Sequence, residues 1–138
     1  MARRSPAVVR AGLPRRARSG TKFSVVSGVP EGATAEIQRV EALRLWPGAV
    51  GEALVRWAGV VYLPGRIDRV IEAAQYHGCP CCDPSEPRDV LEQALAALTP
   101  GSRRALLSRV EPLDEVFLRR TVQNPHAPGD WPWWWRRC

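Results

Sequence analysis

The chain has 138 residues, of which 45% are hydrophobic and 25% are charged, as in a single globular domain with tails. No apolar run is long enough to cross a bilayer, and the arginine-rich N-terminus lacks the continuous apolar segment of a secretory signal. These properties exclude a membrane-spanning protein and favour a cytoplasmic one, in which the four cysteines are reduced thiols or metal ligands.

The basic charge is concentrated at the N-terminus. Residues 1–30 contain seven basic and no acidic residues, whereas the other 13 basic and 14 acidic residues sum to −1. We expect this segment to be a disordered, flexible basic arm, and nucleic-acid binding through its charge is an alternative. The solvated arm is favoured because arginine outnumbers lysine 19 to 1 across the chain, which points to coding bias. The arginines that would contact phosphates are Arg3, Arg4, Arg10, Arg15, Arg16 and Arg18.

Apolar residues then recur at helical spacing. Thr34 is expected to cap a first helix, which ends at Trp46-Pro47-Gly48. A second helix ends at Leu63-Pro64-Gly65, and a third starts at Ile67 and continues into His77. The second helix has the strongest pattern, with an apolar face formed by Val50, Ala53, Leu54, Trp57, Ala58 and Val61.

Three further helices are expected after the cysteine-rich segment. The two prolines of Asp83-Pro84-Ser85-Glu86-Pro87 predict an irregular loop before the fourth helix. Thr99 is expected to cap a fifth helix, with Pro100 at its first position. Glu111-Pro112 is expected to restart the chain into a sixth helix, in which Asp114 and Glu115 complement the helix dipole.

These patterns predict an all-α fold without strands. We expect a small orthogonal or irregular bundle of about five to six short helices over residues 31–122. The basic arm (1–30) precedes this domain, and an extended Pro- and Trp-rich C-terminal tail (123–138) follows it.

The segment His77-Gly78-Cys79-Pro80-Cys81-Cys82 holds three of the four cysteines. Cys79 and Cys82 have the C-x-x-C spacing with which two thiolates grip one tetrahedral zinc ion. One ion cannot easily use every sulfur and imidazole here, because the chain between them is too short to turn. A distant ligand would complete a structural zinc clip, and the full set of candidates is Cys79, Cys82, His77, Cys81, His126 and Cys138.

Two other interpretations of the cysteines stay open. They are incidental thiols, or Cys79 and Cys82 form a redox or thiol-sensing pair. A redox pair usually lies at the N-terminus of a helix, whereas this segment follows a helix and precedes two prolines. The zinc clip is therefore favoured over the redox pair.

Four of the six tryptophans lie within five positions near the C-terminus. Since indole rings are costly to leave in water, the cluster is expected to pack against a surface. We favour a C-terminal lid on the protein's own helices, ahead of a partner interface, a membrane surface or stacking on bases. The candidate interaction residues are Trp131, Trp133, Trp134, Trp135, Arg136 and Arg137.

The chain carries none of the common catalytic or phosphate-loop motifs, so the sequence leans away from an enzyme. We expect a small cytoplasmic binding or accessory protein that acts through protein–protein contacts and contains a structural zinc clip. The alternatives are a thiol-redox or thiol-sensing protein and a nucleic-acid-binding regulator that uses the basic arm.

Overall fold

A computed structural model describes residues 25–77 and 83–138 and shows an all-α fold, as predicted. These residues contain no strand, and a single antiparallel bridge joins Gln123 to Arg137. Every helix among them is too short or too polar to span a bilayer. The elements are α2 (Glu31–Arg44), α3 (Ala49–Val61), α4 (Ile67–His77), α5 (Glu86–Ala97), α6 (Pro100–Arg120) and the 3-10 turn η2 (Trp133–Arg136).

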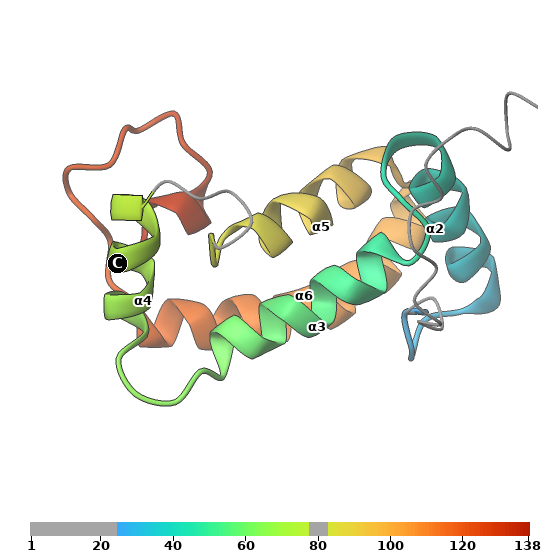
Figure 1. Cartoon of the computed structure of the whole chain (residues 1–138). Helices are drawn as coiled ribbons and strands as arrows, with labels where there is room; N and C mark the ends of the chain where they lie inside the picture. The colour runs from blue at the N-terminus through green and yellow to red at the C-terminus, as the bar shows by residue number, and fades with distance from the viewer. Residues whose placement is uncertain (1–24, 78–82) are drawn as a thin grey trace, which may run out of the picture.

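Helices α3, α5 and α6 run side by side, with α2 at one end of this group and α4 at the other (Figure 1). The most extensive packing is between α3 and α5, followed by α2 and α3 against α6. Both α3 and α6 begin beside α2, whereas α5 runs in the opposite direction (Figure 1). The core lies between these helices and includes the fully buried Trp57 and Phe117, whose ring centroids are 4.8 Å apart.

Charged side chains from neighbouring elements cap the helix ends. Glu41 accepts hydrogen bonds from the backbone N–H groups at the start of α3, and Glu36 accepts them from Thr99 at the start of α6. Arg103 donates to Leu95 and Ala96 carbonyls at the end of α5. Carboxylates therefore meet helix N-termini and a guanidinium meets a C-terminus, as the helix dipole favours.

Helix α2 begins at Glu31, before the predicted cap at Thr34, so that prediction was wrong. Pro30 occupies the N-cap position, and the Thr34 hydroxyl donates to the Pro30 carbonyl instead. The buried Ala33 adds a residue to the apolar face one turn before Ile37, which extends the helix toward the N-terminus.

The predicted break at Glu111-Pro112 was also wrong, because α6 continues through Pro112 and has 21 residues in all. A proline inside a helix removes one backbone hydrogen bond and strains the preceding turn. Pro112 is on the exposed side, whereas Leu106, Val110 and Phe117 are buried on the opposite one. Continuous burial of that face outweighs the local cost of the proline. The helix-start role of Asp114 and Glu115 is therefore wrong as well.

The proline-rich loop before α5 is shorter than predicted. The helix begins at Glu86, and Pro87 lies in its first turn, where a missing N–H removes no helical hydrogen bond. The predicted start of α6 at Pro100, by contrast, is confirmed. Thr99 is its N-cap residue, but its side chain caps no N–H, and Glu36 from α2 supplies the acceptor.

The segment predicted as a basic arm contributes to the core at its end. Val26 is buried against the helices, whereas Val25 is 60% exposed. The six arginines from Arg3 to Arg18 lie outside the described residues, so their contact with nucleic acid stays a prediction.

Candidate functional site

The C-terminal segment, residues 121–138, folds back on the bundle and forms what we call the C-terminal lid. Val122 and Cys138 exchange two backbone hydrogen bonds of 2.9 Å, and Asn124 donates to the Arg136 carbonyl at 2.8 Å. Arg137 donates to the Thr121 hydroxyl at 3.0 Å and to the Leu118 carbonyl at 3.0 Å. These contacts hold the end of the chain against the end of α6.

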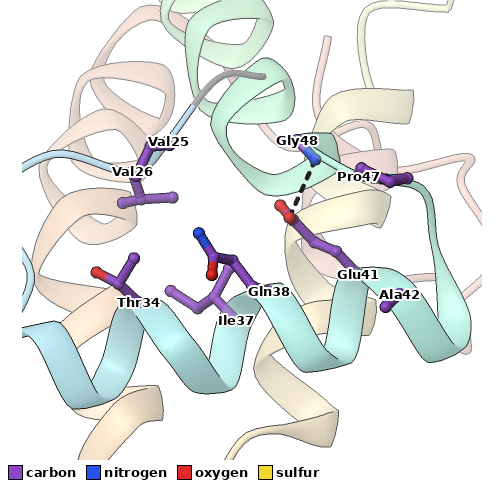
Figure 2. A pocket seen from close by; sticks show the side chains of 9 residues that line it. All are labelled: Val25, Val26, Thr34, Ile37, Gln38, Glu41, Ala42, Pro47 and Gly48. Carbon is purple, nitrogen blue, oxygen red and sulfur yellow. Dashed lines mark hydrogen bonds between the residues drawn. The ribbon is translucent and has the colours of Figure 1, made fainter. Parts of the chain in front are cut away.

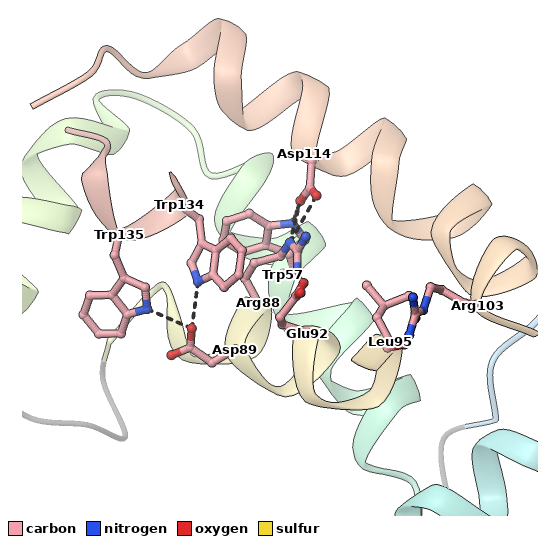
Figure 3. A network of polar contacts seen from close by, with 9 residues as sticks. All are labelled: Trp57, Arg88, Asp89, Glu92, Leu95, Arg103, Asp114, Trp134 and Trp135. Carbon is pink, nitrogen blue, oxygen red and sulfur yellow. Dashed lines mark hydrogen bonds and ion pairs between the residues drawn. The ribbon is translucent and has the colours of Figure 1, made fainter. Parts of the chain in front are cut away.

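Trp134 and Trp135 of η2 lie against α5 (Figure 3), and Trp133 lies against α6. Trp134 is buried, and the Trp133 ring lies 6.2 Å from the Phe117 ring. The indole N–H groups of Trp134 and Trp135 both donate to one oxygen of Asp89, at 2.7 and 2.8 Å. One carboxylate in the first turn of α5 therefore holds two rings of the lid.

Beneath the lid, Arg88 forms the centre of a buried polar network (Figure 3). Its Nε donates to both carboxylate oxygens of Asp114 at 3.1 Å, and its Nη1 donates to Glu92 at 3.0 Å. The guanidinium carbon lies 4.3 Å from the centroid of the Trp134 ring. This geometry permits a cation–π contact, which is stronger where water is excluded.

The carboxylate of Asp114 links this network to the core. Trp57 donates its indole N–H to Asp114 at 2.9 Å, so α3, α5 and α6 meet at one buried group. Burial raises the pKa of Asp114 above its ordinary value of 3.8, while the charge of Arg88 and the hydrogen bonds from Trp57 and Arg88 oppose that rise. Each polar side chain of this network is hydrogen-bonded to another member. The network is therefore better suited to holding the lid in place than to catalysis.

The interpretation of the tryptophans as a lid on the protein's own helices is confirmed for Trp133, Trp134 and Trp135. The C-terminal tail is not extended over its whole length as expected, because the 3-10 turn η2 begins directly after Pro132. Trp131 is 43% exposed and stands edge-on to Trp135. Arg136 and Arg137 are half-buried, and Arg137 bonds to the end of α6 rather than pointing freely into solvent.

Most of the predicted zinc ligands lie where the structure gives no description. Cys79, Cys81 and Cys82 are outside the described residues, and His77 is the last residue of α4, with its side chain also outside the description. His126 is exposed, and Cys138 is half-buried. Within residues 25–77 and 83–138, no three side chains form a group suited to a metal ion. The zinc clip stays a prediction.

The sequence reasoning missed Arg88, Asp89 and Asp114. A signal for two of them was present, because Arg88 precedes Leu91 and Leu95 by three and seven positions, on the buried face of α5. Asp114 likewise shares the buried face of α6 with Val110 and Phe117. Opposite charges on the apolar faces of successive helices indicate a buried pair, since a lone buried charge is too costly.

Two hollows lie beside the segment that precedes α2, which contributes Val25 and Val26 to both. The first, the α2 cleft, has a volume of about 290 Å³ and is shown in Figure 2. It is lined by Val25, Val26, Thr34, Ile37, Gln38, Glu41, Ala42, Pro47 and Gly48.

The second hollow, the α3–α6 groove, has a volume of about 350 Å³. It opens between the two helices, beside the short segment that precedes α2. Its lining is Val25, Val26, Ser27, Gly51, Leu54, Val55, Ala58, Ser108, Arg109, Pro112 and Leu113.

Comparison of the chain with protein-family models, curated proteins and solved structures finds no match. The function is therefore inferred from the surfaces and contacts described above.

Proposed function

We propose that this chain is a helical binding protein that acts through protein–protein contacts, with the α3–α6 groove as its contact surface. The partner is a protein segment that carries an apolar side chain next to an acidic one. The observation that carries this proposal is the mainly apolar groove with a single charged residue, Arg109, in its lining.

The exposure of apolar side chains along the groove supports the proposal. Val55 on α3 is 69% exposed, and Val25 on the facing segment is 60% exposed. Leu54, Ala58 and Leu113 are half-buried behind them. Single exposed apolar residues need no explanation, but several that line one groove are typical of an interaction site.

Charge defines the chemistry of the partner. Arg109 on α6 is exposed, and its guanidinium lies beside Gly28 of the segment that precedes α2. A carboxylate opposite this group would steer association and fix the orientation of the partner. An apolar side chain would fill the groove beside Val55, where burial contributes about 25 cal/mol per Å².

The lid tryptophans are a weaker candidate for the contact surface. Trp134 is buried in the lid, and both Trp134 and Trp135 use their N–H groups on Asp89. Opening the lid to present them would expose the buried Trp134 ring and break both hydrogen bonds to Asp89, which is costly. The groove requires no such opening.

Crosslinking in cells tests the groove directly. A photo-reactive amino acid at position 55 is expected to capture a discrete partner, and the same group at the 83% exposed Leu43 is the matched control. With the photo-reactive group kept at position 55, Val25→Asp and Arg109→Glu should each abolish capture, because one removes an apolar contact of the groove and the other reverses the charge. Equal capture from positions 55 and 43, or capture that survives both substitutions, would contradict the proposal.

As a second part of this proposal, we propose that Cys79 and Cys82 bind a structural zinc ion, because they have C-x-x-C spacing. Elemental analysis of the purified protein should find about one zinc per chain, as one tetrahedral site requires. Thiol titration before and after mild oxidation tests the thiol-redox alternative. Metal-free protein with a reversible loss of two thiols would favour that alternative.

A further inference from the structure

The α2 cleft lies at the point where residues 1–24 join the described chain. Val25 and Val26 form one of its walls, and α2 with the Pro47-Gly48 turn forms the others (Figure 2). Any group on the preceding 24 residues is therefore tethered beside this cleft. A short tether gives an effective concentration in the millimolar range, so even a weak contact is populated.

The lining of the cleft has a distinct chemistry. Among the described residues, the lining is mainly apolar, with Ile37 at its base, and includes no basic residue. Its one ionisable group is Glu41, which accepts hydrogen bonds from the N–H groups of Gly48 at 3.0 Å and Val50 at 2.9 Å. An apolar lining beside a carboxylate suits an apolar side chain that is flanked by positive charge.

Residues 1–24 have that composition. They contain seven basic residues, no acidic residue and one aromatic residue, Phe23. Lys22 comes directly before Phe23, and only Ser24 separates Phe23 from Val25. Two residues of chain span at most about 7 Å, so Phe23 stays within reach of the cleft.

We propose that residues 1–24 bind in the α2 cleft of their own chain, with the Phe23 ring on the apolar floor and the basic side chains toward Glu41. The basic arm is then bound to the helical domain and is not a free, solvated segment. Val25 and Val26 line both hollows, but Gln38 and Ala42 line only the cleft, so substitutions at these two positions test this inference separately from the partner proposed for the α3–α6 groove.

Limited proteolysis of the full chain tests this docking. The arm holds natural trypsin sites, and cleavage after Arg16 and Arg18 can be followed by mass spectrometry. Ala42→Arg places a positive charge at an exposed position of the lining, and Ala35→Arg makes the same change at an exposed position of α2 outside it. If docked molecules outnumber undocked ones by about ten to one, Ala42→Arg should speed cleavage about tenfold. Ala35→Arg should match the unmodified chain.

Two further variants keep the test decisive. Gln38→Arg repeats the charge change at a second exposed lining position, and Phe23→Ser removes the proposed anchor. Both should raise the cleavage rate as Ala42→Arg does, while the melting temperature of each stays near that of Ala35→Arg. Equal cleavage rates in all five proteins would overturn the proposal and leave the arm as a solvated segment. Protection that is lost in Ala35→Arg as well would also overturn it, because the contact would then not depend on the cleft.

Discussion

At both ends of the bundle, charged side chains bond to neighbouring helices, but these side chains differ in how far they are buried. Near α2, Glu36 and Glu41 reach across to the starts of α6 and α3. At the other end, Arg88 pairs with Asp114 beneath the lid, and Asp89 holds the lid itself. In both places a charged side chain from one helix joins another, but Glu36 is only half-buried, whereas Glu41, Arg88 and Asp114 are all buried.

The difference in burial between Glu36 and the Arg88–Asp114 pair decides how much each contact contributes to the stability of the fold. Exposed charged contacts contribute little, since water replaces a lost partner. A buried charge that loses its partner keeps its desolvation cost without compensation. Substitutions under the lid should therefore destabilise the protein far more than a substitution of Glu36, and the following measurements test that ranking.

The largest effect is expected for Asp114→Ala. The substitution leaves the Arg88 guanidinium and the Trp57 N–H without their shared acceptor in a buried site. Breaking a buried pair in this way costs about 3–5 kcal/mol of unfolding free energy. Urea denaturation followed by circular dichroism measures the loss.

A double variant separates the pair from its surroundings. Arg88→Met combined with Asp114→Leu removes both charges together and should recover much of the stability, because apolar replacements of similar volume can substitute for a buried pair. A double variant as unstable as Asp114→Ala would mean that the lost Trp57 hydrogen bond, rather than the unpaired charge, dominates.

A smaller effect is expected for Asp89→Ala, which removes the acceptor of the Trp134 and Trp135 N–H groups. Hydrogen bonds to a charged group contribute about 1.5–3 kcal/mol, so we expect the unfolding free energy to fall by about 2 kcal/mol.

Truncation after Pro125 should lower the melting temperature further, since it removes the buried Trp134 ring as well. A truncated protein with an unchanged melting temperature would show that the lid does not stabilise the bundle.

The sequence predicted most of the fold because apolar periodicity depends on local spacing. The face of Val50, Trp57 and Val61 and the start at Pro100 follow directly from residue order. The continuous α6 was missed, because burial of Val110 and Phe117 on one face overrides the local effect of Pro112. Tertiary packing of this kind has no local signal.

The candidate surfaces were only partly predictable for a related reason. The lid was expected from the cost of exposed indole rings, but its acceptor, Asp89, lies 45 residues from Trp134 in the sequence. The α3–α6 groove depends on how two distant helices pack, which spacing along one helix does not encode. Charges on apolar faces, such as Arg88, were the one usable signal for the buried network.

Arg120→Ala should have a moderate effect. Arg120 donates to the carbonyls of Val61 at 2.5 Å, Leu63 at 2.6 Å and Gly65 at 3.0 Å, and so holds the connection between α3 and α4. These carbonyls are partly open to water, which replaces some of the lost bonds, so we expect a loss of about 1–2 kcal/mol. Arg120→Lys should recover part of it, because an ammonium group cannot span all three acceptors. Amide hydrogen exchange near residues 62–66 should rise in the alanine variant and not elsewhere.

The smallest effect is expected for Glu36→Gln, and it should depend on pH. Hydrogen bonds from Ser102, then from the backbone and side chain of Thr99, hold the pKa of Glu36 below its ordinary value of 4.5. A lowered pKa means that the folded state favours the ionised form, so this contribution is present above pH 4.5 and is lost as the pH falls through the folded-state pKa. The melting temperature of Glu36→Gln should therefore lie slightly below that of the unmodified protein at pH 7, and the two should converge as the pH falls below 4.5. A difference that is constant with pH would show that the charge of Glu36 does not stabilise the start of α6.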